Sequence, residues 1–167
     1  SVAAEESEDA ALKTFLDSNQ KTKLSSRVFE EELLLSALSE KILPVILSAT
    51  PQAMKGNKLS ALFGVSGDNP ILTVKTGEEN TEIFLTPFLR INKTLRSIGI
   101  KNDLLIAFDD CSLSKSQIEE AVKKEGSELM LGVNGGIHLV NLSDHTEDDI
   151  RLIRDCSCFY LDYEAES

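Results

Sequence analysis

The chain has 167 residues, of which 41% are hydrophobic and 27% are charged, and its formal net charge at pH 7 is −11. This length and composition are typical of one globular domain that can bury a sizeable core. The negative charge argues against binding to nucleic acids and to anionic membrane surfaces, because the chain would repel their phosphate groups. No apolar run approaches the ~20 residues of a membrane span, so we expect no membrane insertion.

The N-terminal residues and the cysteines favour a cytoplasmic protein. Residues 1–7 (SVAAEES) are interpreted as a flexible acidic tail, since they lack the basic and apolar regions of a signal peptide. A signal removed upstream of this tail stays open. The cysteines, Cys111, Cys156 and Cys158, are too few for a disulfide framework. The C-x-C spacing of the last two fits neither a zinc site nor a redox motif, so we expect no metal, no cofactor, and two buried thiols on one face of a strand.

From residue 8 to residue 167 the hydrophobic pattern predicts one continuous domain, which begins with two amphipathic helices. Pro44 is expected to end the second helix, because proline lacks the N–H that helices need. The expected elements of this part are a helix over 8–18, a helix over 27–41 capped by Ser25 and Ser26, and a strand over 44–48.

The middle of the chain is rich in β-branched and aromatic residues, which favour strands. A glycine that follows a helical pattern marks the end of a helix. The expected elements are a loop over 51–70 with one helical turn or a short strand, a hairpin of strands 71–77 and 81–87, a helix over 88–99 ending at Gly99, and a strand over 102–110.

The last third alternates helical and strand patterns, with capping-box spacing at two helix starts. The expected elements are a helix over 113–126 capped by Ser114 and Gln117, two strands within 127–142, a helix over 146–155 capped by Thr146 and Asp149, and a strand over 157–163. The predicted fold class is therefore α/β: a single domain in which helices pack on a central mixed β-sheet, preceded by two N-terminal helices.

The stretch 127–142 (SELMLGVNGGIHLVNL) contains an Asn-Gly-Gly at 134–136 between two apolar runs. Dinucleotide-binding loops and P-loops open a helix, whereas IHLVNL after these glycines alternates like a strand. Asn-Gly between apolar runs is a strong hairpin signal, because both residues tolerate positive φ. The sequence therefore predicts a bend and not a phosphate-binding loop.

A few polar residues remain as candidates for ligand binding, and none of them belongs to a recognised catalytic motif. Asp109 and Asp110 follow a predicted strand, and carboxylates at strand ends can bind Mg²⁺ with a phosphate ligand. They can equally cap a turn, as the acids at 147–149 can stabilise the start of a helix. With His138 and Asn134 these two acids form the candidate binding set, and no residue is assigned a catalytic role.

Three segments carry a resemblance to a known family. They are the Leu-rich helix ending in LLLSALSEKILPVIL, the run EIFLTPF at 82–88, and ELMLGVNGG at 128–136. In this order and spacing, over about residues 30–142, they resemble the SseB-like (enhanced serine sensitivity) N-terminal domain. Thr86-Pro87 and Asn134-Gly135 depart from that family's Thr-Ser and Asn-Pro. The resemblance implies an α/β interaction domain without catalytic residues. A shorter stretch, 81–110, is similar to part of a ubiquitin-like β-grasp unit.

The sequence therefore favours a protein-binding or adaptor module. Its acidic charge suits a basic partner through electrostatic steering, and a homo-oligomer is also compatible. The binding face is expected near 71–88, where an exposed edge strand could accept a partner strand, or on the N-terminal helices. Two alternatives stay open: an immunity- or antitoxin-type inhibitor of a basic enzyme, and an enzyme that binds a metal or phosphate ligand through Asp109, Asp110 and His138.

Overall fold

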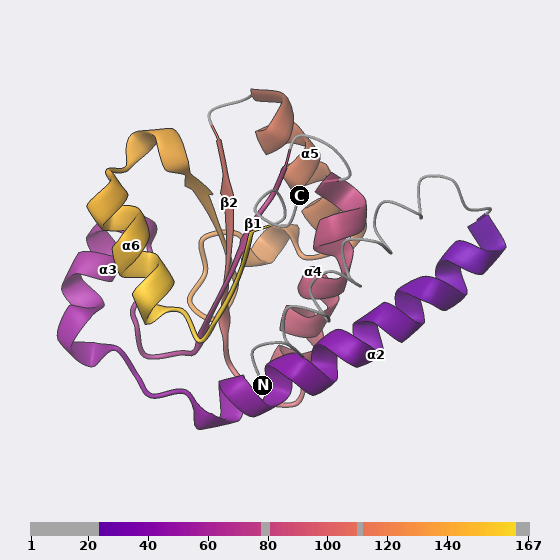
Figure 1. Cartoon of the computed structure of the whole chain (residues 1–167), viewed down its shortest axis with the longest axis horizontal. Coiled ribbons are helices and arrows are strands. Elements are labelled where there is room, and N and C mark those ends of the chain that lie inside the picture. The colour runs from indigo at the N-terminus through magenta and orange to yellow at the C-terminus, as the bar shows by residue number, and fades with distance from the viewer. Residues whose placement is uncertain (1–23, 78–80, 110–111, 163–167) are drawn as a thin grey trace.

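Four parallel β-strands form the centre of the protein, and helices cover both faces of the sheet (Figure 1). The computed structural model describes residues 24–77, 81–109 and 112–162. Within these ranges the strand order across the sheet is β3-β2-β1-β4. The strands are β1 (Ile71–Lys75), β2 (Asp103–Phe108), β3 (Ile137–Asn141) and β4 (Phe159–Asp162).

The sequences of the two central strands explain their position. Every residue of β2 and all but the last residue of β1 are buried, as expected for continuous apolar runs in a sheet covered on both faces. Neighbouring parallel strands need crossover connections, and helices supply them. The α/β class is confirmed, but the described strands all run parallel, where a mixed sheet was expected. The crossover helices are α4 (Thr81–Ser97), α5 (Ser112–Lys124) and α6 (Glu147–Cys156).

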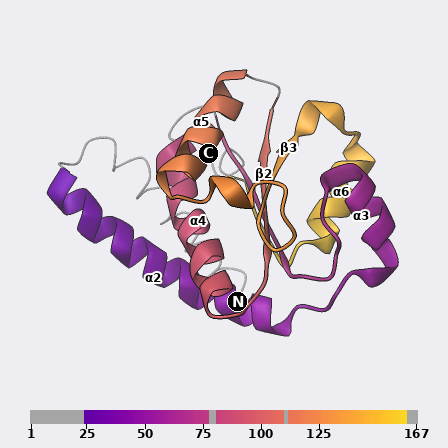
Figure 2. The ribbon, with the colours of Figure 1, turned by 180° about the vertical axis from the view of Figure 1, so that it is seen from behind.

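The direction of the crossovers decides which face each helix covers. The chain steps from β1 to β2 to β3, then returns past both to place β4 on the far side of β1. Because crossovers are right-handed, this reversal puts α6 on the opposite face from α4 and α5. Figures 1 and 2 show α2 (Leu24–Ser48) alongside α4 on one face, and α3 (Gly56–Phe63) alongside α6 on the other.

Each face of the sheet has its own hydrophobic core. The larger core lies between the sheet and α2, α4 and α5, and the smaller lies between the sheet and α3 and α6. Alternate residues of β2 divide between them, because successive side chains of a strand point to opposite faces. Leu104 and Ile106 belong to the larger core, and Leu105 and Ala107 belong to the smaller.

Helix α2 continues through Pro44 to Ser48, so the prediction of a helix end and a strand over 44–48 is wrong. Proline leaves the carbonyl four residues earlier, that of Glu40, without its helical partner. Both residues are exposed, so water can bond to that carbonyl. Ile42 and Ile46 are buried on the other side of the helix. Their burial contributes roughly 1.5–3 kcal/mol each, which offsets the penalty of about 3 kcal/mol for an interior proline.

The predicted strand 81–87 is also wrong, because this segment forms the first half of α4. Its large apolar residues Phe84, Leu85 and Phe88 recur at helical spacing, and all three are buried in the larger core. Packing against the sheet therefore overrides the strand propensity of the segment. As a result β1 lies inside the sheet, and the exposed edge strand expected within 71–88 does not exist there: β3 and β4 form the edges.

The stretch 127–142 turns at Asn134 and Gly135, as predicted, but it does not form a hairpin. The first apolar run contains a 3₁₀ turn (Glu128–Met130) and a single isolated bridge, and only the second run forms a strand. That strand, β3, pairs in parallel with β2. The second run therefore pairs with the long buried strand β2, and not with the first run as a hairpin would require.

Several helix ends agree with the sequence. Gly99 and Gly126 follow α4 and α5 with φ of 86° and 69°, as expected for helix-ending glycines. Thr146 and Asp149 form the predicted capping box at the start of α6. By contrast, the predicted cap Ser114 lies inside α5, which begins at Ser112. The loop expected over 51–70 contains the complete helix α3, and the helix predicted over 8–18 lies outside the described residues.

The two C-terminal cysteines do not share a strand. Cys156 is the last residue of α6, and Cys158 precedes β4. The prediction that both thiols point from one face of a strand is therefore wrong, although Cys156 is buried and Cys158 is half-buried. The helix extends to Cys156 because its buried positions, Ile153 and Cys156, are spaced one turn apart against the smaller core.

Candidate functional site

The residues that the sequence grouped as one ligand site lie at two different edges of the sheet. Asp109 follows β2 and lies at the carboxyl edge, where parallel sheets usually bind ligands. Asn134 and His138 lie at the amino edge, and His138 is in register with Leu105. Four residues of strand, about 13 Å, separate Leu105 from Asp109. Asp110 lies outside the described residues. The structure therefore brings Asn134 and His138 together and leaves Asp109 apart from them.

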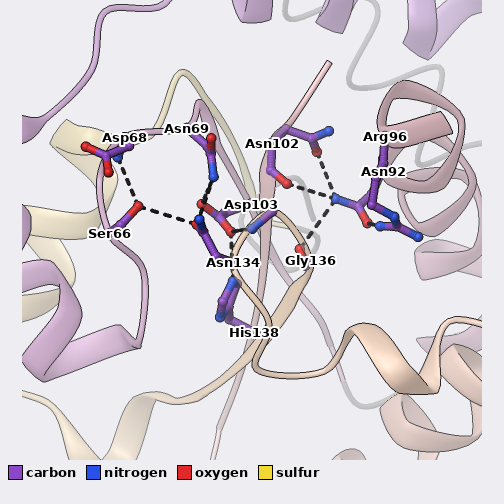
Figure 3. Close-up of polar contacts among 11 residues, drawn as sticks. Ser66, Asp68, Asn69, Asn92, Arg96, Asn102, Asp103, Asn134, Gly136 and His138 are labelled. Atoms are coloured by element: carbon purple, nitrogen blue, oxygen red, sulfur yellow. Dashed lines mark hydrogen bonds and ion pairs between the residues drawn. The ribbon is translucent and has the colours of Figure 1, made fainter. Parts of the chain in front are cut away.

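At the amino edge, Asp103 and His138 form a buried pair (Figure 3). The Asp103 side chain is 0% exposed and that of His138 is 4% exposed, and Asp103 Oδ1 lies 2.9 Å from His138 Nε2. The same oxygen accepts the backbone N–H of Gly135 at 2.7 Å. The other oxygen, Oδ2, accepts the side-chain amide of Asn69 at 3.3 Å. These donors replace the hydration that the carboxyl group loses on burial.

This network assigns the proton positions on the His138 ring. The Asp103 carboxylate acts as an acceptor toward Gly135 and Asn69, so the proton shared with the ring belongs to Nε2. In the neutral ring Nδ1 then carries a free lone pair. No described residue donates a hydrogen bond to Nδ1. In this tautomer Nδ1 is an acceptor without a donor among the described residues.

The network also joins segments that are distant in the sequence. Asn69 Nδ2 donates to Asn134 Oδ1 at 2.9 Å, and the Ser66 hydroxyl donates to the same oxygen at 3.4 Å. The loop after α3, the first residue of β2 and the turn at Asn134 are thus connected through side chains (Figure 3). The Ser66 hydroxyl in turn accepts the backbone N–H of Asp68 at 3.2 Å. Such linked polar groups are stronger together than separately.

A second polar cluster holds α4 against the same turn. Asn92 is 0% exposed, and its amide donates to Asn102 Oδ1 at 2.9 Å and to the Gly136 carbonyl at 3.4 Å. Its Oδ1 accepts Arg96 Nη1 at 2.7 Å. Every polar atom of the Asn92 side chain has a partner within the protein, so this cluster is structural.

His138 lines a cavity of about 430 Å³ beside the edge strand β3. A Cβ placed on Gly64 would lie 3.9 Å from His138 Nδ1, so the free nitrogen faces the wall that Gly64 forms. The neighbouring Phe63 ring contacts His145 at 4.8 Å between ring centroids. The remaining walls are Glu119 from α5 and the segment around β3, namely Leu131, Gly132 and Leu139.

An apolar groove of about 340 Å³ lies between α2 and α4, on the face opposite the smaller core. Leu47 and Ile98 are both 66% exposed at its rim, and Leu43 is 37% exposed. Ser39 and Thr94 are its polar side chains, and no charged residue lines it. Among the described residues these three large aliphatic side chains are exposed together, and a contiguous exposed apolar patch can mark an interaction site.

A third, polar cavity of about 280 Å³ contains both C-terminal thiols at the amino edge of β1 and β4. Burial is the main cause that raises the pKa of both Cys156 and Cys158. For Cys156 the neighbouring Asp155 raises the pKa further, while Lys55 lowers it. The thiolate form is therefore disfavoured, and these cysteines do not have the environment of a reactive nucleophile.

Sequence reasoning selected His138 and Asn134 but missed Asp103, Asn69 and Ser66. Asp103 directly precedes the apolar run LLIAF. An acid at the start of a buried strand is a signal for a buried carboxyl group that needs hydrogen-bond donors. No local pattern pairs Asp103 with a histidine 35 residues later, because the contact depends on the β2–β3 register. Among the described residues no group of three or more His, Cys, Asp or Glu could hold a metal ion.

The fold and these sites define a three-layer α/β domain with a parallel sheet, a buried Asp–His pair and an exposed apolar groove. Comparison with protein-family models, with curated proteins and with solved structures found no match. None of the helices in the described ranges is long and apolar enough to cross a membrane. Glu82–Phe88 and the end of the Leu-rich helix, two of the segments that resemble the SseB-like domain, are helical here.

Proposed function

We propose that the protein is a protein-binding module and that the groove between α2 and α4 is its binding surface. The observation that carries the proposal is the exposure of Leu43, Leu47 and Ile98 together around one apolar groove. Contiguous exposed apolar patches can mark interaction sites, whereas single exposed apolar residues need no explanation.

The shape of the groove favours a helix as the bound element. Leu35, Ser39, Leu43 and Leu47 follow one another at intervals of four residues along α2, and Ile91, Leu95 and Ile98 form the wall on α4. Two helices that leave a channel between them can receive the apolar stripe of a third, as in helix-in-groove recognition. The partner segment is therefore an amphipathic helix whose apolar residues recur every three or four positions.

The partner's polar face is expected to be basic. The groove itself contains no charged side chain, so specificity within it comes from shape. The chain around it has a net charge of −11. Long-range attraction to a basic protein would speed association and would weaken as salt rises.

The experiment compares binding by the wild type with binding by Leu47→Glu and Ile98→Glu. Both positions are largely exposed, so folding stability should change by no more than about 0.5 kcal/mol. A charge in the groove should weaken binding of the helix by at least about tenfold, since it would be desolvated without a partner. Leu129→Glu is the matched control, because Leu129 is 87% exposed and lies outside the groove.

A partner captured by the wild type and by Leu129→Glu, but lost with both groove variants, supports the proposal. A partner retained by the groove variants contradicts it. Sedimentation of the isolated protein comes first, because a second copy could occupy the groove. If the wild type is a dimer and Ile98→Glu makes it a monomer, the groove binds a second copy of this chain and not a helix of another protein. A tight one-to-one complex with a basic enzyme that loses activity would favour the inhibitor alternative.

A further inference from the structure

The cavity beside β3 offers a ligand hydrogen-bond acceptors and apolar surface, but few donors. The polar side chains on its walls are His138 and Glu119. In the tautomer that donates from Nε2 to Asp103, His138 Nδ1 is an acceptor, and the exposed side chain of Glu119 contributes a carboxylate. The wall contains no Lys, Arg, Ser or Thr side chain.

The backbone of the wall does not supply the missing donors at its two glycines. The N–H of Gly64 is bonded to the carbonyl of Ser60 at 3.0 Å, and the N–H of Gly132 is bonded to the carbonyl of Ile137 at 2.7 Å. Glycine-rich walls bind phosphates through free N–H groups, and these two are occupied. A phosphate placed against these two glycines would therefore receive no backbone hydrogen bond from them, and it would meet the Glu119 carboxylate.

We propose that this cavity binds an alkylammonium group. The ammonium donates one hydrogen bond to His138 Nδ1 and lies close to the Glu119 carboxylate. Its alkyl chain packs on Phe63, Leu131 and Leu139. Three features carry the proposal together: a histidine nitrogen in a nine-tenths buried side chain that has no described donor, a single negative charge on the wall, and apolar surface between them. The cavity volume of about 430 Å³ is within the range of small-ligand sites.

The first test titrates the folded protein with n-butylammonium chloride at constant ionic strength, following the ¹⁵N signals of the His138 ring. We expect saturable binding at one site and a shift of the Nδ1 resonance, because its lone pair becomes engaged. Neutral n-butanol, which has the same alkyl length, should bind at least tenfold more weakly. Equal effects of the two compounds, or no saturation with n-butylammonium, would overturn the proposal.

The second test uses two neighbouring residues of α5. Glu119→Gln should lower the affinity for n-butylammonium about tenfold, since it removes the charge from the wall. Glu119 and Glu120 are both exposed, but only Glu119 lines the cavity, so Glu120→Gln should leave the affinity unchanged. Equal losses in both variants would mean general attraction to an acidic protein and would refute the site.

The alkylammonium group could come from a free amine or from a lysine side chain of another protein. Nα-acetyl-lysine N-methylamide, tested in the same titration, separates these sources. Tighter binding of this compound than of n-butylammonium assigns the site to a lysine, and weaker binding assigns it to a free amine. The groove between α2 and α4 and this cavity share no residue. If Leu47→Glu and Ile98→Glu leave partner binding unchanged, the groove proposal fails and the amine proposal is unaffected.

Discussion

Asp103 and His138 join the first residue of β2 to the second residue of β3 across 2.9 Å, although 35 positions separate them in the chain. His138 is in register with Leu105, two residues along β2 from Asp103. The ring therefore reaches back toward the amino edge of the sheet, where the carboxyl group also bonds to Gly135 and Asn69. One buried carboxyl group thus determines how the turn, the edge strand and the loop after α3 fit together.

Replacement of Asp103 by Asn should destabilise the protein by about 2–3 kcal/mol, because its amide would face donors and leave buried groups unpaired. Urea denaturation followed by circular dichroism measures the loss. Asp109→Asn at the exposed end of the same strand is the control, with an expected change within about 0.5 kcal/mol. A similar loss of unfolding free energy in both variants would show that the hydrogen bonds of Asp103 do not stabilise the protein.

Replacement of Gly136 by Ala should destabilise by about 3 kcal/mol, since the added methyl group would overlap the backbone of the turn. A Cβ at this position would press against the Met130 carbonyl and lie 2.9 Å from the Val133 carbonyl oxygen. At Gly99 an added Cβ meets no atom within 4 Å, and the only cost is the strain of an alanine at a φ of +86°. Gly99→Ala should therefore destabilise by about 1 kcal/mol. Thermal unfolding of both variants tests the order. A larger loss for Gly99→Ala would contradict the steric argument.

Replacement of Pro44 by Ala should stabilise the protein by about 1–2 kcal/mol. The new N–H can bond to the Glu40 carbonyl inside α2, and this gain exceeds the extra entropy of the unfolded chain. Pro51→Ala, in an exposed segment without helical structure, should instead destabilise by about 0.4–1 kcal/mol. Opposite signs of the two changes in the free energy of unfolding are the expected result. Destabilisation by Pro44→Ala, like that by Pro51→Ala, would mean that α2 does not use the restored bond.

The thiols of Cys156 and Cys158 should react with iodoacetamide far more slowly in the native protein than in urea. Burial raises the pKa of both groups above the ordinary value of 9.0, so little thiolate is present near neutral pH. Peptide mass spectrometry reads each site separately, and the labelling rate should rise only at alkaline pH. Rapid labelling at pH 7 would instead indicate a reactive thiol.

The same shifts give stability a pH dependence of known sign. A raised pKa in the folded state means that the unfolded chain releases the thiol proton first as pH increases. The contribution to stability is complete below pH 9.0 and is lost as pH rises through the folded-state value. Cys156→Ser should reduce the slope of the unfolding free energy against pH in this alkaline range. An unchanged slope would assign the dependence to other groups.

The amino-acid sequence is sufficient to predict the elements that depend on a few adjacent residues. The apolar runs of β1 and β2, the capping box of α6, and Gly99 and Gly126 after their helices agree with it, because strand burial, side-chain caps and positive φ depend on a few adjacent residues. It also selected Asn134 and His138, which the structure places at one edge of the sheet.

The other features depend on contacts between distant parts of the chain. Pro44 and Pro87 lie inside helices because α2 and α4 bury their apolar faces against each other and against the sheet, and this gain exceeds the local penalty of proline. The second run of 127–142 pairs with β2 and not with the first run. Asp103 meets His138 through that same register. A contact between distant residues depends on the packing of whole elements, and no local pattern in the chain contains that information.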